Sequence, residues 1–366
     1  MADAGAMGKG WFGMEQMIQE ILQQGIAMGG SDLFLVPGSP LRLKKKGAML
    51  ALEGEKLTPR DSEEIMQQLF DLAGRSPGKL LEEGDDDFAF SLQGVGRFRC
   101  TAYRQRGSLA AVIHIVAFGL PDAEEMHIPP AVMELAKERS GMVLVCGPAG
   151  SGKSTTLACL VDSINRERSG HIVTLEDPIE YLHFHRGCLV SQREIGHDTG
   201  GYLEALRASL RQTPDVILLG GMWDGETMEA ALTAAESGKL LLSSLHTVNA
   251  AETIQRIADA FPAQQRGLIL ARLSLLLKAV VCQQLLPAEG GGVEPAFEIL
   301  RLSPEVQQCI RRGDVAGADM LLRSGQIPGT QSMDSHILWL FQEKRISRET
   351  ALAYAAHPDA MVQNID

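Results

Sequence analysis

The order of apolar and polar residues divides the chain into two parts. Residues 14–28 have the spacing of an amphipathic helix, and short alternating segments such as DLFLV and RFRCTAYRQR follow it. Alternation with a period of two is typical of strands that bury one face, so this part predicts a small α/β domain with an antiparallel sheet. The segment GLPDAEEMHIPP, residues 119–130, is rich in proline and glycine and predicts a linker.

The part after the predicted linker has near-continuous apolar segments with helical patterns between them. These segments are MVLVC, HIVTLE, DVILLG and KLLLSSLH. Strands without alternation are buried on both faces, which is typical of a parallel sheet covered by helices. From Gln265 onward the pattern predicts mostly helix. We therefore expect an α/β N-terminal domain over residues 1–118, a linker over 119–130, and a second α/β domain with a helical C-terminal part over 131–366.

Composition narrows the class of protein. The chain has 366 residues, of which 45% are hydrophobic, enough for two domains with their own cores. Its first residues contain no apolar run that resembles a signal peptide, and the apolar stretch 268–286 is interrupted by Arg272 and Lys278, so we expect a cytoplasmic protein. The net charge is −12, most of it after residue 118, which disfavours a nucleic-acid partner.

The six cysteines include no CxxC pair. This spacing argues against a zinc module and against a disulfide framework, and it predicts buried reduced thiols.

A phosphate-binding loop is the strongest chemical signal in the chain. GPAGSGKST fits the pattern GxxxxGK[ST], follows a predicted strand and opens a predicted helix. Its glycines let backbone N–H groups approach phosphates, Lys153 would reach the β- and γ-phosphates, and the hydroxyl of Ser154 would ligate Mg²⁺. The predicted nucleotide-binding residues of this loop are Gly147, Pro148, Ala149, Gly150, Ser151, Gly152, Lys153, Ser154 and Thr155.

Ligands of open α/β sheets bind beyond the carboxyl ends of the strands, so the residues that follow each strand matter. Glu176 is the last residue of HIVTLE, and Asp177 and Glu180 follow it. His246 follows KLLLSSL. We expect these side chains to meet the phosphate loop at one edge of the sheet.

The strand DVILL ends instead in Gly220 and Gly221, where a nucleotide hydrolase would place an acid. Asp215 cannot replace that acid, because it begins the same strand, roughly 20 Å from the other end. Asp224 and Glu226 lie just beyond the glycines, and the sequence leaves the direction of their side chains open.

Several segments together resemble the secretion ATPases of type II secretion and type IV pili. They are GPAGSGKSTTLA, TLEDPIEYL, LVSQREIGHDT, EALRASLRQTPDVILLG, TAAESGKLLLSSLHT and TIQRIADAFP. The resemblance covers most of the chain and is nearest to the pilus retraction, or twitching-motility, type. It implies a ring-shaped hexamer whose subunits have a PAS-like N-terminal domain and a RecA-like ATPase domain. Such a ring uses ATP and Mg²⁺, lies at the inner membrane at the pilus base, and drives pilin out of the pilus through a platform protein.

The resemblance also implies roles for single residues. Lys153 and Ser154 correspond to the Walker A pair, Glu180 to the general base, and His246 to the His-box sensor. Arg97, Arg99 and Arg106 resemble N-domain arginines that reach toward the nucleotide, where they would offset charge that develops during phosphoryl transfer. Glu176 and Asp177 belong to the nucleotide-binding EDPIE segment.

The chain departs from the family pattern at four positions. The family reads GEMRD where this chain reads GGMWD, so Gly221 replaces the Walker B glutamate and Trp223 replaces an arginine. His114 stands where we expect an arginine, and Phe34 stands where the family has histidine. We expect slow hydrolysis, since Glu180 remains as the base.

Other functions fit part of the sequence. One alternative is an accessory subunit that binds ATP, hydrolyses it poorly and joins a ring with an active paralogue. A small-molecule kinase would explain only the phosphate loop, and charge disfavours a DNA translocase.

Two short motifs have ordinary structural explanations. HFH, residues 183–185, has the spacing of a metal pair, although no further ligands accompany it, and we expect solvated side chains. The lysines at 44–46 could meet an acidic membrane, but lysines on a strand edge more often prevent edge pairing.

Whether Trp223 packs in the core or contacts a partner stays open.

Overall fold

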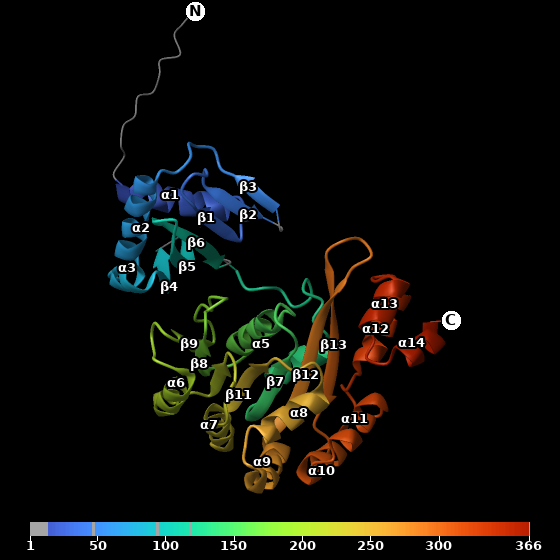
Figure 1. Ribbon diagram of the computed structural model, residues 1–366. Helices are drawn as coiled ribbons and strands as arrows, with labels where there is room; N and C mark the ends of the chain where they lie inside the picture. Colours follow the sequence, from blue (N-terminus) through green and yellow to red (C-terminus); the bar gives the residue numbers. More distant parts are fainter. Residues whose placement is uncertain (1–13, 46–47, 93–94, 117–118, 366) are drawn as a thin grey trace, which may run out of the picture. The chain divides into compact units, whose positions relative to one another are not determined.

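The computed structural model describes residues 14–45, 48–92, 95–116 and 119–365, and it divides into two compact units between residues 118 and 119. Each unit has its own sheet (Figure 1). The predicted class, a mixed α/β chain with two sheets, is confirmed. Among the described residues, no helix combines the length and the apolarity needed to cross a bilayer.

The N-terminal unit is an antiparallel sheet covered by helices. The strands follow the order β3-β2-β1-β6-β5-β4. Its elements are α1 (Met14–Ala27), β1 (Asp32–Leu35), β2 (Arg42–Lys45), β3 (Ala48–Ala51), α2 (Pro59–Leu72), α3 (Gly78–Glu83), β4 (Asp85–Leu92), β5 (Gly96–Gln105) and β6 (Ser108–Val116).

One face of this sheet forms the core of the unit. On β5, Phe98, Cys100 and Ala102 are fully buried and alternate with more exposed Arg97 and Arg99. This period of two is the alternation visible in the sequence, and it places the arginines on the face away from the core.

The lysine run lies elsewhere than predicted. Lys44 and Lys45 belong to β2, which pairs with β1 on one side and β3 on the other. The strand at the edge is therefore β3, and the prediction of an edge device is wrong for these two lysines. Lys46 lies outside the described residues.

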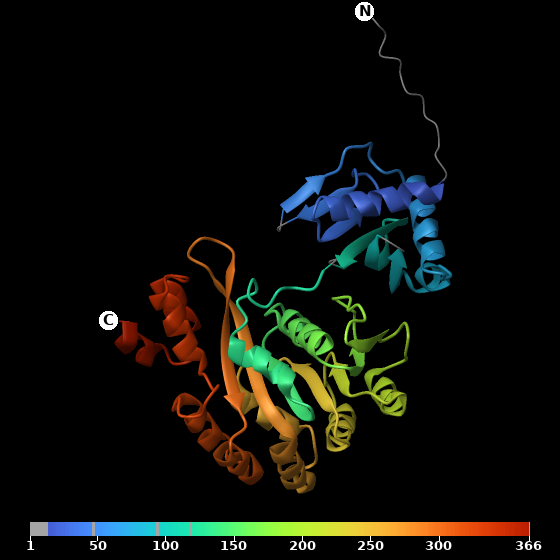
Figure 2. The ribbon, with the colours of Figure 1, turned by 180° about the vertical axis from the view of Figure 1, so that it is seen from behind.

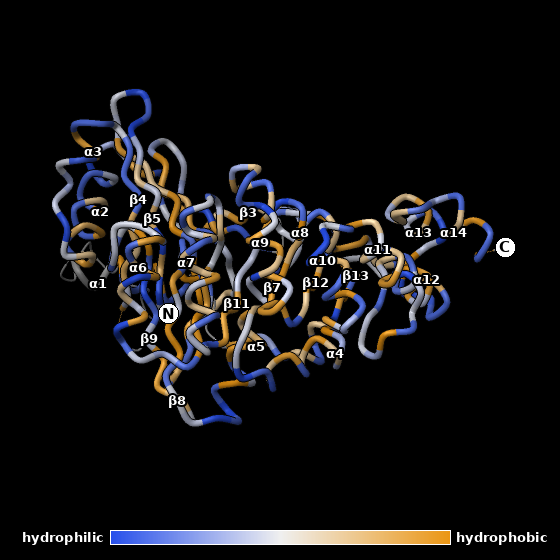
Figure 3. The backbone as a smooth tube through the Cα atoms, turned by 90° about the horizontal axis from the view of Figure 1, so that it is seen from below, coloured by the Kyte–Doolittle hydropathy of each residue, from blue (hydrophilic) through white to orange (hydrophobic). Residues whose placement is uncertain are grey.

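The second unit is built on a mainly parallel sheet with the order β13-β12-β7-β11-β10-β8-β9, in which β13 runs antiparallel to β12. Figure 3 shows hydrophobic segments running through its central strands. Its strands are β7 (Gly141–Cys146), β8 (Gly170–Glu176), β9 (Cys188–Glu194), β10 (Val216–Leu219), β11 (Leu240–Leu245), β12 (Leu277–Pro287) and β13 (Val293–Arg301).

Helices cover both faces of this sheet. Buried residues of α4 and α5 pack on one face, and those of α6 to α11 pack on the other (Figures 1 and 2). The helices are α4 (Pro130–Met133), α5 (Lys153–Glu167), α6 (Tyr202–Ser209), α7 (Gly225–Glu236), α8 (Ala250–Asp259), α9 (Ala263–Leu276), α10 (Pro304–Arg312), α11 (Val315–Arg323), α12 (Met333–Gln342), α13 (Arg348–Tyr354) and α14 (Pro358–Ile365), with 3₁₀ turns η1 (Glu134–Lys137) and η2 (Leu210–Gln212).

The prediction of a mostly helical region after Gln265 missed two long strands. Helix α9 passes directly into β12 at Leu277, and β12 pairs with β13 along its length. The apolar run 268–286 crosses this change without a break, and periodicity alone cannot separate a buried helix from a buried strand. The C-terminal helices α12 to α14 cover the far part of this hairpin, where Ile337 and Leu340 pack against Leu286 and Ala296.

The thiols match the expectation except at one position. All six cysteines lie in the described residues and are free; five are buried, and Cys309 is partly exposed.

The predicted linker packs on the second unit over part of its length. Ile128 is 7% exposed within the core beneath α4 and α5, and the carbonyl of Pro121 accepts a hydrogen bond from the Cys159 thiol. Nδ1 of His127 lies 3.0 Å from Oε1 of Glu294, which Arg345 also contacts at 2.8 Å. Glu294 is only 5% exposed, so a buried carboxylate holds the segment before α4 onto β13.

Glu294→Gln should loosen residues 121–128 without unfolding the unit. The substitution removes the negative charge that Arg345 and His127 share, and breaking a buried ion pair of this kind leaves a cation uncompensated. We expect at least tenfold faster amide hydrogen exchange in this segment, measured by mass spectrometry.

Glu289→Gln, at an exposed position on the same hairpin, is the matched control and should leave this exchange unchanged. Equal exchange in both variants would mean that the apolar contacts of Ile128 hold the segment by themselves.

Candidate functional site

The phosphate loop connects β7 to α5, as predicted. Gly147 has a φ of 145°, and a Cβ there would lie 2.2 Å from the carbonyl oxygen of Gln283. Gly152, at the N-cap of α5, has a φ of 87°. Both positions require glycine, one for close approach to β12 and one for its backbone conformation.

Lys153 turns back into the loop. Its side chain is buried, and Nζ donates hydrogen bonds to the carbonyl oxygens of Gly147 at 2.9 Å and Pro148 at 2.8 Å. Burial lowers the pKa of Lys153. The ammonium group and the free N–H groups at the start of α5 together make this end of the helix a site for anions.

Three carboxylates of the EDPIE segment lie at this edge of the sheet. Oγ of Ser154 donates to Oε1 of Glu180 at 2.7 Å, so the predicted magnesium ligand and the predicted base are in contact. Glu176 accepts hydrogen bonds from Thr174 and Gln192, and burial raises its pKa to about 7. Asp177 is exposed.

These groups open into one cavity of about 310 Å³. Because it combines a cation and a hydroxyl from the loop after β7, carboxylates from the end of β8 and an imidazole from the end of β11, it suits a phosphate ester with a hard metal ion. Its lining includes Ala149, Gly150, Lys153, Ser154, Glu176, Asp177, Glu180, Tyr181, His183, Tyr202, Gly220, Trp223, Ser244 and His246.

His246 lies where the sequence predicts, directly after β11. Burial, and after it the charge of Lys153, lowers the pKa of His246 below the ordinary histidine value. The imidazole is therefore neutral at physiological pH and can both donate and accept a hydrogen bond.

The end of β10 presents no acid to the cavity. A Cβ at Gly220 would lie 3.2 Å from the Leu175 carbonyl oxygen, so β8 closely approaches this strand end. Asp215 accepts a hydrogen bond from the backbone N–H of His171 at the opposite end of the sheet. Asp224 caps α7, where it accepts from both the N–H and the hydroxyl of Thr227 at 2.8 Å.

Glu226 is exposed in the first turn of α7 and lines a different cavity beside Ala260 and Gln265. Neither open candidate, Asp224 nor Glu226, lines the cavity of the phosphate loop.

The three predicted arginines do not form one cluster. Arg97 and Arg99 lie on the exposed face of β5, where Arg99 pairs with Asp87. Arg106 lies in the turn after β5, with a φ of 47°, and nine residues of strand separate it from Arg97 by about 30 Å. His114 pairs with Arg99 across the sheet and contacts Asp32 at 2.9 Å.

Sequence reasoning missed the residues that support the loop. Gln283, on β12, donates from Nε2 to the Ser151 carbonyl and accepts at Oε1 from the Thr156 hydroxyl. Tyr181 contacts the Thr155 hydroxyl at 2.8 Å. The preference of ligands for strand ends could have identified Gln283, if the sequence had shown that β12 lies beside β7.

The HFH segment is a loop, and its first histidine is not solvated. His183 is 8% exposed and lines the cavity, and burial lowers its pKa to about 4. His185 accepts a hydrogen bond from the N–H of Val190. Within the described ranges no group of three or more His, Cys, Asp or Glu side chains could hold a metal.

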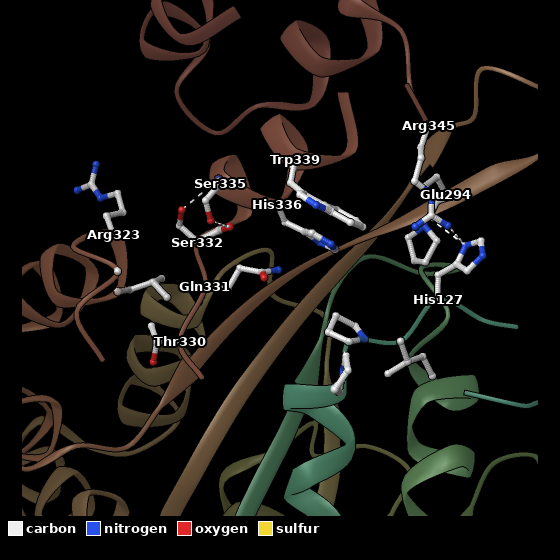
Figure 4. Close-up of a pocket in the computed structure, with 16 residues that line it drawn as sticks. His127, Glu294, Arg323, Thr330, Gln331, Ser332, Ser335, His336, Trp339 and Arg345 are labelled. Carbon is white, nitrogen blue, oxygen red and sulfur yellow. Dashed lines mark hydrogen bonds and ion pairs between the residues drawn. The ribbon is translucent and has the colours of Figure 1, made fainter. Parts of the chain in front are cut away.

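A larger cavity, of about 630 Å³, lies between the segment before α4, the start of β13 and α12 (Figure 4). His127 and Arg345 on its wall are already in contact with Glu294, and Trp339 stacks on His336 at 5.4 Å. Its charged groups are therefore not arranged like those of the phosphate loop.

Comparisons with a protein-family model and with individual proteins point to the same family. Residues 106–311 match the family described as type II/IV secretion system protein. The chain is 37% identical to the type IV pilus ATPase PilU of Pseudomonas aeruginosa, over 92% of this chain and 88% of that protein. It is 38% identical to the type IV pilus retraction ATPase PilT of the same organism, over 93% of this chain and 99% of PilT.

Solved structures agree with the sequence relatives. The crystal structure of the pilus retraction motor PilT with bound ADP matches with a TM-score of 0.87 and 38% identity, covering 94% of this chain and 99% of that chain. The ATPase DotB of Legionella pneumophila, at 23% identity and a TM-score of 0.81, shares the fold.

Gln283→Leu should weaken Mg·ATP binding by about tenfold or more. The change leaves the Ser151 carbonyl and the Thr156 hydroxyl without their partners, and each such loss costs about 1–3 kcal/mol. Isothermal titration calorimetry on the full chain measures the effect.

Gln284→Leu, at the next residue on the other face of β12, is the control and should bind as the wild type does. If Gln283→Leu also kept wild-type affinity, the loop would hold its form without this side chain.

Proposed function

The chain belongs to the type II/IV secretion system protein family, and on this premise we propose that it is an ATP-driven motor of the pilus-retraction type. In this proposal six copies form a ring at the cytoplasmic side of the inner membrane, at the pilus base. ATP hydrolysis then drives pilin out of the filament through a membrane platform protein. The proposal is supported by homology to PilT and PilU along nearly the whole chain.

The observation that carries the proposal is the meeting of the phosphate loop, Glu180 and His246 in one cavity. A phosphate loop alone would also suit a small-molecule kinase. A carboxylate in contact with the hydroxyl of Ser154, and a neutral imidazole at the neighbouring strand end, add the groups that a hydrolase needs for its water and its metal.

The residues divide the work as follows. The loop N–H groups and Lys153 would bind the phosphates, which requires Lys153 to leave the carbonyls of Gly147 and Pro148. Glu180 would take the proton of the attacking water. His246 would hydrogen-bond near the terminal phosphate.

The donor set fits Mg²⁺. Ser154 offers a hydroxyl beside the carboxylate of Glu180, and magnesium prefers such oxygens together with substrate phosphates and water. The described residues hold no preformed metal cluster, which suits a cation that arrives with the nucleotide. When bound, Mg²⁺ would neutralise charge on the phosphates.

Arg97, Arg99 and Arg106 remain candidates for charge stabilisation. Their separation along β5 means that at most one end of the strand could serve a given nucleotide. Arg99 would first have to release Asp87.

The second candidate function is an accessory subunit in a mixed ring with an active paralogue. The bare end of β10 favours it, because Gly221 offers no carboxylate and Asp224 is committed to the cap of α7. Such a subunit would bind ATP and contribute little hydrolysis.

Glu180→Gln should lower kcat by about 10²-fold or more with a smaller change in KM, because general-base assistance is worth about 10²–10⁴-fold. Lys153→Ala should abolish nucleotide binding and sets the blank. Steady-state ATP hydrolysis and calorimetric binding by the purified oligomer measure both. Glu226→Gln, which changes a carboxylate outside the cavity, should behave as the wild type.

The same assay separates the two functions. A wild type that hydrolyses well above the Lys153→Ala blank is a working motor. A wild type that binds ATP yet hydrolyses at the blank rate is the accessory subunit, and one that fails to bind nucleotide contradicts both.

A further inference from the structure

Gly221 and Trp223 are in contact in a way that any side chain at position 221 would prevent. A Cβ on Gly221 would lie 2.4 Å from Cζ2, 2.6 Å from Cε2 and 2.9 Å from Nε1 of the Trp223 indole. Gly221 is not among the residues with a positive φ, so its backbone conformation does not require glycine. Glycine is needed here for the space that the indole occupies.

The same indole contacts His246. The two ring centroids are 4.8 Å apart, and the planes meet at 84°, which is an edge-to-face arrangement. Both rings line the cavity of the phosphate loop. Trp223 is still 51% exposed, so it lines the cavity at the protein surface and is not part of the core.

The backbone around this contact is held in place. The hydroxyls of Ser243 and Ser244, on β11, donate to the carbonyls of Leu219 and Gly220 at the end of β10. The two strand ends that carry the indole and the imidazole are thus joined directly. The ring contact therefore has a defined geometry.

We propose that Gly221 and Trp223 act as one unit that positions His246 in the phosphate site. Gly221 leaves room for the indole against the main chain, and the edge-to-face contact of the indole fixes the imidazole of His246 inside the cavity. Trp223 is thus a positioning residue for ATP hydrolysis, and this role rests on the proposed ATPase function.

One consequence concerns restoration of an acid at position 221. Glutamate there would drive the indole away from the main chain and so release His246. Gly221→Glu by itself should therefore lower hydrolysis, whereas Gly221→Glu with Trp223→Ala has room for the carboxylate and should be more active than Gly221→Glu alone.

A double-mutant cycle tests the coupling. Trp223→Ala should lower kcat by up to about tenfold, the size expected for loss of an aromatic contact, with little change in KM. Gly221→Ala should have a similar effect, because its methyl group displaces the indole. The double variant should equal Trp223→Ala alone, since no indole remains to be displaced.

Conservative substitution separates positioning from structure. Trp223→Phe keeps an aromatic ring and should retain most of the wild-type kcat. Val248→Ala removes an exposed apolar side chain two residues after His246 and should change nothing.

Indole emission provides a readout that needs no nucleotide. Protonated imidazole quenches a neighbouring indole, so the difference in emission between the wild type and Trp223→Phe should titrate with His246. The other titratable groups that line this cavity include Lys153, Glu176, Asp177, Glu180 and His183, and of these Lys153 lowers the pKa of the imidazole. We expect a midpoint below pH 6.5, because burial and Lys153 oppose the charged imidazole. The titration should vanish in His246→Gln.

Two results would overturn the inference. One is a double variant whose kcat falls by the product of the reductions that Gly221→Ala and Trp223→Ala cause separately. The other is Trp223 emission that does not respond to His246→Gln. Failure of the ATPase proposal is distinct: it would appear as hydrolysis equal to that of Lys153→Ala, while the emission titration would still report the ring contact.

Discussion

The close contact between the phosphate loop and β12 fixes the geometry of the second unit. Gly147 lies against the carbonyl of Gln283, where no side chain fits, and the side-chain amide of Gln283 contacts Ser151 within the loop and Thr156 in the first turn of α5. A shift of the loop relative to β12 would therefore break these contacts. The far end of the same hairpin carries Glu294, which holds His127 in the segment before α4. One pair of strands thus supports both the nucleotide site and the segment through which the chain enters this unit.

Burial is the main cause of the pKa shifts of Lys153, Glu176 and His246 at the site. Lys153 is held by carbonyl oxygens until a phosphate offers a stronger partner, since charge-assisted contacts exceed neutral ones. Burial raises the pKa of Glu176 and lowers that of His246, so both are closer to neutral than their types suggest. The acid with a direct contact to the predicted magnesium ligand is Glu180. A site arranged in this way keeps a carboxylate beside the predicted magnesium ligand although the end of β10 supplies none.

The absence of a side chain at position 221 is tied to the tryptophan that follows it. The indole of Trp223 fills the space next to Gly221 and contacts His246, so Gly221 and Trp223 form one structural unit. Because of this contact, the segment that follows β10 lines the cavity with the indole of Trp223. Asp224 and Glu226 supply no acid to this cavity for separate reasons, because Asp224 caps α7 and Glu226 lines a different cavity.

The sequence by itself determined four of the strands around the site, β7, β8, β10 and β11, and the loop that connects β7 to α5. Their apolar segments and the glycine-rich loop lie where the sequence predicts them, because period and glycine content are local properties. The tertiary structure decided what depends on residues far apart in the chain. It showed that the run after Leu277 is a strand beside β7, that Gln283 supports the loop, and that His183 is buried. Periodicity cannot distinguish a buried strand from a buried helix, and no local pattern reveals that the ring of Trp223 needs the space beside Gly221.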